Sequence, residues 1–329
     1  MYPKKRRPGA GAVKAIRLVL ILMAFAATVT RAAAADEECV VPARQGGGFD
    51  LTCRLVHALA EETGGLRITY MPGGVGAVAY NMIVAQRRAE SGTLVAFSGG
   101  SLLNLAQGKF GKFTGKEVRW LATIGADYGM VAVRADAPFR NIGELLAAVR
   151  RTPRRLVFGG GGTIGSQDWI KAASLLRAAN IGHRAFPYVS FEGGGEASTA
   201  LLSGHVDVYT GDVSEVRNLW REGKIRILGV LADARLEGEF ANVPTAKEQG
   251  FPVTWRIVRG FYLGPDVPAE NYEHWVRRFD TLLASETFRR ARHQSGLLPF
   301  DKTGREIDAY IDGALAEYRA MAERFGLIN

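Results

Sequence analysis

The sequence predicts an α/β fold built on parallel sheets. Short apolar segments with strand character alternate along the chain with longer helical segments, which is the pattern of this fold class. The chain has 329 residues, enough for about two such domains. Five junctions between an expected strand and an expected helix carry a glycine-rich turn, and these lie at residues 46–50, 73–76, 98–101, 161–166 and 193–196.

The first part of the chain contains five apolar runs that are expected to form strands. They span residues 39–43, 66–70, 93–97, 118–124 and 130–133. Between them, helices are expected where a glycine turn is followed by a longer run without strand character. The first of these helices spans 50–63, and the second runs from the turn at 73–76 to about residue 86. A further helical turn begins at 98–101.

The second part repeats the same alternation and ends in helices. Asn141 is expected to cap a helix that continues to residue 150. Further strands are expected at 155–158, 185–189, 206–210 and 225–231, followed by a crossing segment at 254–263. The remaining helices are expected at 166–179, from 193–195 to 203, and at 212–221, 268–284, 286–294 and 303–325.

The positive charge of the chain is concentrated at its N-terminus. The sequence has 42 basic and 33 acidic residues, a formal net charge of +9 that suggests a nucleic-acid or membrane-surface partner. However, residues 1–35 contain seven of the basic residues and none of the acidic ones. They combine a basic start, an apolar run and the small residues 32–35, which predicts a secretory signal peptide cleaved after Ala35. The other 35 basic and 33 acidic residues leave +2, so no nucleic-acid partner is expected.

The two cysteines, Cys39 and Cys53, both follow the expected cleavage site. An exported protein meets an oxidising compartment, where a disulfide is stable. Closing a loop of about 15 residues in this way would stabilise the fold by about 3 kcal/mol. The alternative is a pair of buried free thiols.

The glycine turns predict an anion site. Glycine lets the backbone approach a ligand closely, and the first N–H groups of a helix have no partner within the helix and carry the positive end of its dipole. Parallel α/β sheets bind ligands beyond the carboxyl ends of their strands. Several such turns in one crevice would therefore bind an anion without a cluster of arginines.

The sequence gives little support for an enzyme. Residues 160–165 match G-x-G-x-x-G, which keeps a dinucleotide-dependent oxidoreductase as an alternative, but the next suitable acid, Glu192, lies too far away for a ribose contact. A nucleophile elbow, G-x-S-x-G, fails at Ser98 because Ala96 stands in place of its first glycine. The histidines lack the spacing of metal ligands, and they are His57, His183, His205, His274 and His293. The sequence predicts no catalytic residue, metal or cofactor.

At the glycine turns the chain resembles a known family. The segments are CVVPARQGGGFDLTCR (39–54), YMPGGVGAVAYN (70–81), FSGGSLLNLAQGKF (97–110), GGGGTIGSQDW (159–169), YVSFEGGGEASTA (188–200), GHVDVYTGD (204–212) and GFYLGPDVP (260–268). In this order they are similar to the substrate-binding receptors of tripartite tricarboxylate transporters, the Bug family. The resemblance covers essentially all of residues 36–329.

The resemblance implies a two-domain periplasmic-binding-protein fold of the Venus-flytrap type with crossover strands. Domain I would comprise residues 36–134 plus 255–329, and domain II residues 135–254. Such a receptor is periplasmic, is expected to be a monomer, and is not an enzyme. It binds a small di- or tricarboxylate, citrate-like as a first guess, and delivers it to a large and a small integral membrane subunit. An extracytoplasmic sensor of the same fold is the alternative.

The resemblance also implies which residues face the ligand. From domain I, the loop with Gly47, Gly48, Phe49 and Asp50 would hold one carboxylate through its backbone N–H groups, although Asp50 has capping of its own helix as an equal alternative. The remaining expected contacts are hydroxyls of Ser98 and Ser101, a second carboxylate site at Thr163, Ser166 and Gln167, and Asp212, which would accept from a ligand hydroxyl or order its loop.

The chain departs from the family pattern at three places. Gln45 stands where many members have proline, and Met71 stands in a turn that commonly carries arginine. Glu192 and Glu196 add two acids near the expected anion site. Either these acids face away from the ligand, or the ligand is not a simple polyanion.

Overall fold

The computed structural model describes residues 37–57, 65–184 and 186–328, together with residues 1 and 3. The chain divides into two compact units, Met1–Asp36 and Glu37–Asn329. The expected signal peptide, residues 1–35, lies almost entirely outside the described residues, so the following description concerns the second unit. Among the described residues, no helix combines the length and apolar character needed to cross a bilayer.

In the part of the chain that the structure describes, ten strands form two sheets that share one long strand, β4 (Arg119–Arg134). In the first sheet, β1 (Glu38–Val41) is parallel to β2 (Arg67–Tyr70) and β3 (Thr93–Ser98). β9 (Arg256–Leu263) runs antiparallel to β3 and to residues 119–128 of β4. β10 (Leu298–Thr303) also pairs antiparallel with β4. The first sheet is therefore mixed: β2, β1 and β3 are parallel to one another on one side, and β9, β4 and β10 pair antiparallel on the other.

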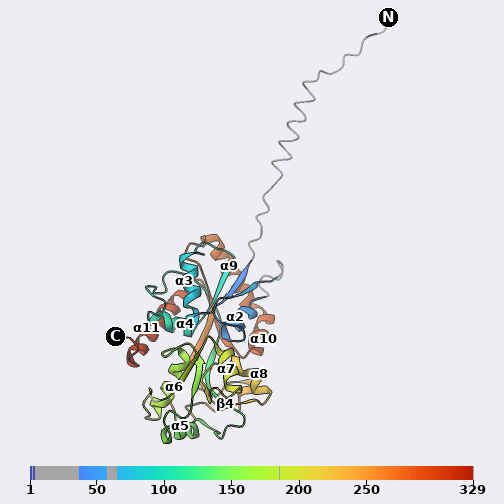
Figure 1. The fold of residues 1–329 in the computed structure, drawn as a ribbon. Coiled ribbons are helices and arrows are strands. Elements are labelled where there is room, and N and C mark those ends of the chain that lie inside the picture. Colours follow the sequence, from blue (N-terminus) through green and yellow to red (C-terminus); the bar gives the residue numbers. More distant parts are fainter. Residues whose placement is uncertain (2, 4–36, 58–64, 185, 329) are drawn as a thin grey trace. The chain divides into compact units, whose positions relative to one another are not determined.

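The second sheet uses the other end of β4. Residues 129–134 pair antiparallel with β8 (Ile225–Leu231), and Ala132 pairs with Tyr209 of β7 (Val208–Tyr209). β5 (Phe158–Gly161) is parallel to β7 and to β6 (Tyr188–Phe191). Because β4 continues from one sheet into the other, it is the first crossover strand, and the chain returns to the first sheet at β9 (Figure 1).

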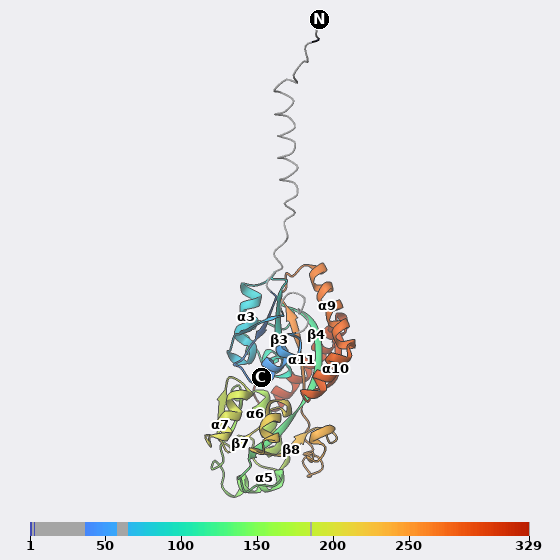
Figure 2. The same ribbon diagram turned by 90° about the vertical axis from the view of Figure 1, so that its right-hand side faces the viewer.

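The helices divide between the two sheets (Figures 1 and 2). Those packed on the first sheet and its neighbours are α2 (Gly48–Leu55), α3 (Ala77–Ala85), α4 (Gly99–Ala106), α9 (Ala269–Ala284), α10 (Glu286–Gln294) and α11 (Arg305–Arg324). Those around the second sheet are α5 (Ile142–Arg151), α6 (Gln167–Ala178), α7 (Gly194–Leu202) and α8 (Val213–Arg221). Two short 3₁₀ turns, η2 (Gly74–Gly76) and η3 (Gly238–Phe240), complete the described elements.

The apolar strands and helix faces bury three hydrophobic clusters. One lies under α2 and β1 and includes Phe49, Phe261 and Phe279. Another lies under α7 and α8. The third contains residues packed on both sheets, such as Phe97 and Phe158, and so gives the two halves a common interior.

The predicted order of elements is confirmed, with four differences in detail. The two strands expected at 118–124 and 130–133 are one strand, because β4 passes through Gly125–Gly129 without a turn. β5 begins at Phe158, where the expected strand 155–158 ends. α2 ends at Leu55, and part of the helix expected at 50–63 lies outside the described residues. β10 was not predicted, since the second half of Leu298–Thr303 is polar.

Candidate ligand-binding site

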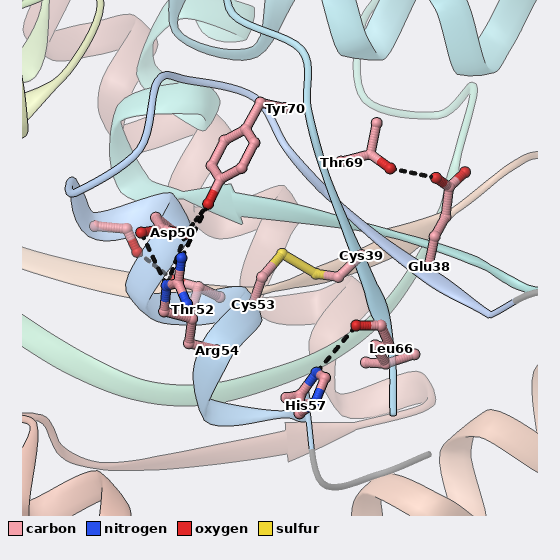
Figure 3. Close-up of a disulfide and its surroundings, with 11 residues drawn as sticks. Glu38, Cys39, Asp50, Thr52, Cys53, Arg54, His57, Leu66, Thr69 and Tyr70 are labelled. Carbon is pink, nitrogen blue, oxygen red and sulfur yellow. Dashed lines mark hydrogen bonds and ion pairs between the residues drawn. A yellow bond between two sulfur atoms is a disulfide. The ribbon is translucent and has the colours of Figure 1, made fainter. Parts of the chain in front are cut away.

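The loop before α2 is held in place by its own side chains. Gly47 is the N-cap of α2, and Phe49 is buried in the cluster under α2. Asp50 accepts hydrogen bonds from the Gly46 N–H at 3.0 Å, from Arg54 at 3.0 Å and from the Tyr70 hydroxyl at 2.8 Å. Figure 3 shows Arg54 and Tyr70 pointing to Asp50 beside the disulfide. Asp50 therefore fixes the glycine loop, and it does not cap α2.

The predicted disulfide is confirmed. Cys39 of β1 and Cys53 of α2 are bonded, and both are fully buried (Figure 3). The bond ties the helix that begins at the glycine loop to the central strand of the parallel part of the first sheet.

Ser98 and Ser101 form the cap of α4. The Ser98 hydroxyl oxygen accepts from the Gly100 N–H at 3.2 Å, and the Ser101 hydroxyl oxygen accepts from the Ser98 N–H at 3.3 Å. Both residues are buried. In the β3–β9 ladder Ser98 lies opposite Arg259, so this cap is next to the charged residues described below.

The predicted residues at the start of α6 have different environments. Ser166 is buried and caps α6, accepting from the Trp169 N–H at 3.4 Å. Gln167 contacts Gly100 of α4, and its side-chain oxygen is buried with no hydrogen-bond partner among the described residues. Thr163 is exposed. The structure thus brings Gln167 and the α4 cap together and leaves Thr163 at the surface.

The glycine turns of the two halves touch. A Cβ atom built on Gly47 would lie 3.3 Å from the Gly194 nitrogen, and one built on Gly195 would lie 2.8 Å from the Gln45 carbonyl oxygen. The Gln107 side chain donates to the Gly165 carbonyl at 2.7 Å. Arg44 forms an ion pair with Glu196 at 2.9 Å, so this acid is neutralised from the other half of the molecule. The absence of side chains on the glycines allows this closed arrangement.

A cluster of five buried charges lies beneath these turns. We call Lys171, Arg259, Asp127, Asp168 and Asp212 the buried charge cluster. Asp212 joins its two cations, accepting from Lys171 at 2.5 Å and from Arg259 at 2.8 Å. Lys171 also bonds Asp168 at 2.8 Å, and Arg259 bonds Asp127 at 2.9 Å. The cluster crosses the interface, because Asp127 and Arg259 lie on strands of the first sheet and the other three on elements of the second.

The ion pairs of Asp212 with Lys171 and Arg259 favour its ionised form. Burial by itself raises the pKa of a carboxyl group, but the charges of Lys171 and Arg259 outweigh it and hold the pKa of Asp212 below its usual value. Conversely, its two carboxylate neighbours raise the pKa of Lys171 despite burial. Both oxygens of Asp212 are engaged by cations, so it joins elements of the two sheets.

Glu215 of α8 lies where three helices begin. Its Oε1 accepts from the Gly48 N–H of α2 at 2.9 Å, and its Oε2 accepts from the Asp212 N–H at 3.2 Å and from the Tyr209 hydroxyl. A Cβ atom on Gly194, the first residue of α7, would overlap the Glu215 carboxylate. Burial of the carboxylate, together with the charges of Asp212 and Asp168, raises the pKa of Glu215 to about 7.

Sequence reasoning missed the residues that dominate this interface. Lys171 and Arg259 each stand alone as a cation within an apolar run, and Asp168 precedes Lys171 by three residues on one helix. A search for charged residues inside expected core segments would have found both cations. Glu215 gave no such signal, since α8 is rich in polar residues.

The structure also bears on cofactor sites. Among the described residues, no group of three or more His, Cys, Asp or Glu side chains is arranged to hold a metal ion. In the G-x-G-x-x-G segment, Asp168 accepts from the Gly161 N–H at 2.7 Å. The chain's own carboxylate thus occupies the turn that a dinucleotide pyrophosphate would need, which disfavours the oxidoreductase alternative.

Comparison with known proteins agrees with this geometry. Residues 109–327 match the family model described as the tripartite tricarboxylate transporter family receptor. A relative from Pseudomonas sp. (strain P51), the UPF0065 protein in the tcbD-tcbE intergenic region, is 26% identical over 223 residues, which are 66% of this chain and 65% of that protein. The chain thus spans just under two thirds of the length of this relative.

Solved structures of similar fold cover nearly the whole second unit. The R. palustris protein Rpa4515 with adipate has a TM-score of 0.80 at 18% identity and covers 88% of this chain and 97% of that one. MatC (Rpa3494) from Rhodopseudomonas palustris with bound malate has a TM-score of 0.74 at 22% identity and covers 86% and 97%. These likenesses show the two-domain fold of periplasmic binding proteins. The chain therefore belongs to the receptor family of the tripartite tricarboxylate transporters.

Proposed function

We propose that this protein is a periplasmic receptor that binds a small di- or tricarboxylate between its two domains. It passes the ligand to the large and small membrane subunits of a tripartite transporter and catalyses no reaction. The domain boundaries proposed from the sequence remain 36–134 plus 255–329 and 135–254. β4 passes between the sheets at residues 128–129, six residues before the first boundary, and β9 returns at the second.

One observation carries the proposal. The start of α2, which the sequence predicts as a carboxylate site, holds a carboxylate oxygen: Oε1 of Glu215, 2.9 Å from the Gly48 nitrogen. Helix N-termini favour anions through free N–H groups and through the helix dipole. The same donors would serve a ligand carboxylate, with the α4 cap on the same side of the interface and Gln167 on the opposite side.

The ligands of the structural neighbours narrow the chemical class. The two neighbours named above are described with adipate and with malate, which are dicarboxylates. A citrate-like tricarboxylate remains a candidate, the first guess from the sequence. Dicarboxylates therefore head the list for a screen.

A thermal-shift screen tests the proposal. A ligand that binds the native state raises the melting temperature by mass action, corresponding to about 2.7 kcal/mol at a hundredfold excess over Kd. Tricarboxylates, dicarboxylates, monocarboxylates and aromatic acids would be compared with chloride and sulfate at equal ionic strength. We expect a specific rise with dicarboxylates, and no rise with any acid would refute the proposal.

Transport and sensing make different demands on the same receptor. Uptake of the bound acid in cells should require the two membrane subunits together with this chain. A sensor would bind the acid equally well but leave uptake unchanged when its gene is removed. That outcome would refute the proposed role in transport, in favour of sensing, and would leave the proposed ligand class unchanged.

A further inference from the structure

We propose, building on the function above, that Glu215 is a built-in competitor for the carboxylate site at the start of α2, and that a ligand carboxylate binds there together with one proton taken up by Glu215. The neutral Glu215 then donates its O–H to the incoming carboxylate, which accepts from the Gly48 N–H in its place.

The contacts of Glu215 place it at the anion position itself. Its carboxylate receives N–H groups from the first residue of α2 and from the N-cap of α8, and it packs against the first residue of α7. Three helix N-termini thus meet on one side-chain carboxylate. A ligand carboxylate that uses the Gly48 N–H must share or take over this position.

A buried group beside the site has unused hydrogen-bonding capacity. Arg259 is 1% exposed, and its Nε is buried with no hydrogen-bond partner among the described residues. The guanidinium lies against Gly48, where a Cβ atom would overlap Nη1. The side chain that packs on the first residue of α2 therefore has one buried donor without a partner among the described residues.

The surrounding charges prevent two ionised carboxylates from sharing this position. The two cations of the cluster are each already bonded to two aspartates, so the cluster has one more carboxylate than cations before Glu215 is counted. Adding a second anion beside ionised Glu215 costs Coulomb energy in a poorly solvated site. The charged and titratable groups that act on Glu215 include Asp212 at the start of α8, Tyr209 on β7, Asp168 on α6 and Arg259 on β9.

The ease of protonation follows from the same surroundings. The pKa of Glu215 is raised to about 7 by burial and by Asp212 and Asp168. Below about pH 7 the Glu215 carboxyl group is mostly neutral, so ligand binding takes up only a small fraction of a proton. Above it, each bound carboxylate must bring a proton from solvent, so affinity falls as the pH rises.

Calorimetry on the full mature chain, with malate and adipate as probes, tests the inference without any variant. Titrations between about pH 6.5 and 8.5 in buffers of different ionisation enthalpy report the protons taken up. We expect uptake to approach one proton per ligand at the upper end, and Kd to rise about tenfold per pH unit above about 7. Binding without proton uptake and with a flat pH profile would overturn the inference, while leaving the proposed function intact.

A charge-neutral variant adds a second readout. Glu215→Gln mimics the protonated side chain, so it should bind malate or adipate at the upper pH about as tightly as the wild type does at the lower pH, with no proton uptake. Glu222→Gln, at the exposed C-terminal end of the same helix, is the matched control and should behave as the wild type. If wild type and both variants bind neither probe at any pH, the proposed dicarboxylate function fails with the inference.

Discussion

At the scale of single residues, the closest approach in the site lies between Gly48 and Arg259. The guanidinium of Arg259 occupies the space that any side chain at position 48 would need. Arg259 cannot easily yield, because it is held by Asp127 and Asp212 inside the interface. Glycine at position 48 is therefore required by a buried charge and not by an unusual backbone angle.

Gly48→Ala tests this packing. The new methyl group forces Arg259 or α2 to shift, and overpacking of this kind costs about 1–3 kcal/mol in the free energy of unfolding. We expect a lower urea midpoint and weaker binding of dicarboxylates. Gly182→Ala is the control, since no atom lies within 4 Å of a Cβ atom there, and it should change stability by less than about 0.5 kcal/mol. Equal behaviour of the two variants would contradict the packing argument.

At the scale of elements, α2 is a short helix fixed by a covalent bond and by ion pairs. It spans Gly48–Leu55, too short to be stable by itself, and Cys53 ties it to β1. Asp50 and Arg54, four residues apart, add an ion pair of 3.0 Å on its outer face. The orientation of the Gly48 N–H therefore depends on the attachment of this helix to the sheet.

Reducing the disulfide should loosen that attachment. Loop-closure entropy for a separation of 14 residues predicts a loss of about 3 kcal/mol. Denaturant unfolding with and without reductant measures it, and a double Cys39→Ala, Cys53→Ala variant serves as control because reductant has nothing to break. A wild type with the same midpoint under both conditions would show that the bond adds no stability.

The alternation of apolar runs and glycine turns is enough to predict most elements. The wrong predictions for β4 and β10 have a common cause. β4 was read as two strands because a crossover strand changes its neighbours at Gly129, where the sequence shows a glycine and a change of pattern. β10 was missed because it pairs at a sheet edge and alternates weakly. The apolar periodicity of a segment indicates how that segment is buried. The change of neighbours along β4 and the edge pairing of β10 depend on other segments, so periodicity does not show them.

At the scale of the whole molecule, the C-terminal residues link the two halves. α11 packs on α4 and β10 of the first half, and Phe325 at its end packs on Trp169 of α6 with ring centroids 6.1 Å apart. Arg177 lies over the Phe325 ring at 4.8 Å. Closure of the two domains around a ligand, the motion expected of this fold, must therefore be compatible with this contact.

Phe325→Ala should weaken the link between the halves. Removing a buried phenylalanine costs about 3–5 kcal/mol, and here the loss falls on contacts that join α11 to α6. We expect a lower urea midpoint and a larger radius of gyration of the unliganded protein in solution scattering. Phe300→Ala removes a ring that packs on Tyr310 within the first half, so it should leave the radius unchanged. An unchanged radius for both variants would argue against the link.

The sequence by itself determined the α/β class, the order of the elements, the disulfide partners and the family. These depend on local patterns, such as apolar periodicity, glycine turns and the spacing of motifs, which remain visible in one dimension. It also identified the glycine loop that the proposed site uses.

Only the tertiary structure decided what faces that loop. Lys171, Asp212 and Glu215 come from the second half, and Asp127 and Arg259 from the crossover strands of the first, and their contacts join residues up to 167 positions apart. The charges of the buried charge cluster are tolerated because each cation is paired with two aspartates, and the pair between Arg259 and Asp212 crosses the interface. Pairing between distant segments leaves no periodic signal in the sequence. Only the contact between the two halves shows that the carboxylate of Glu215 lies at the start of α2.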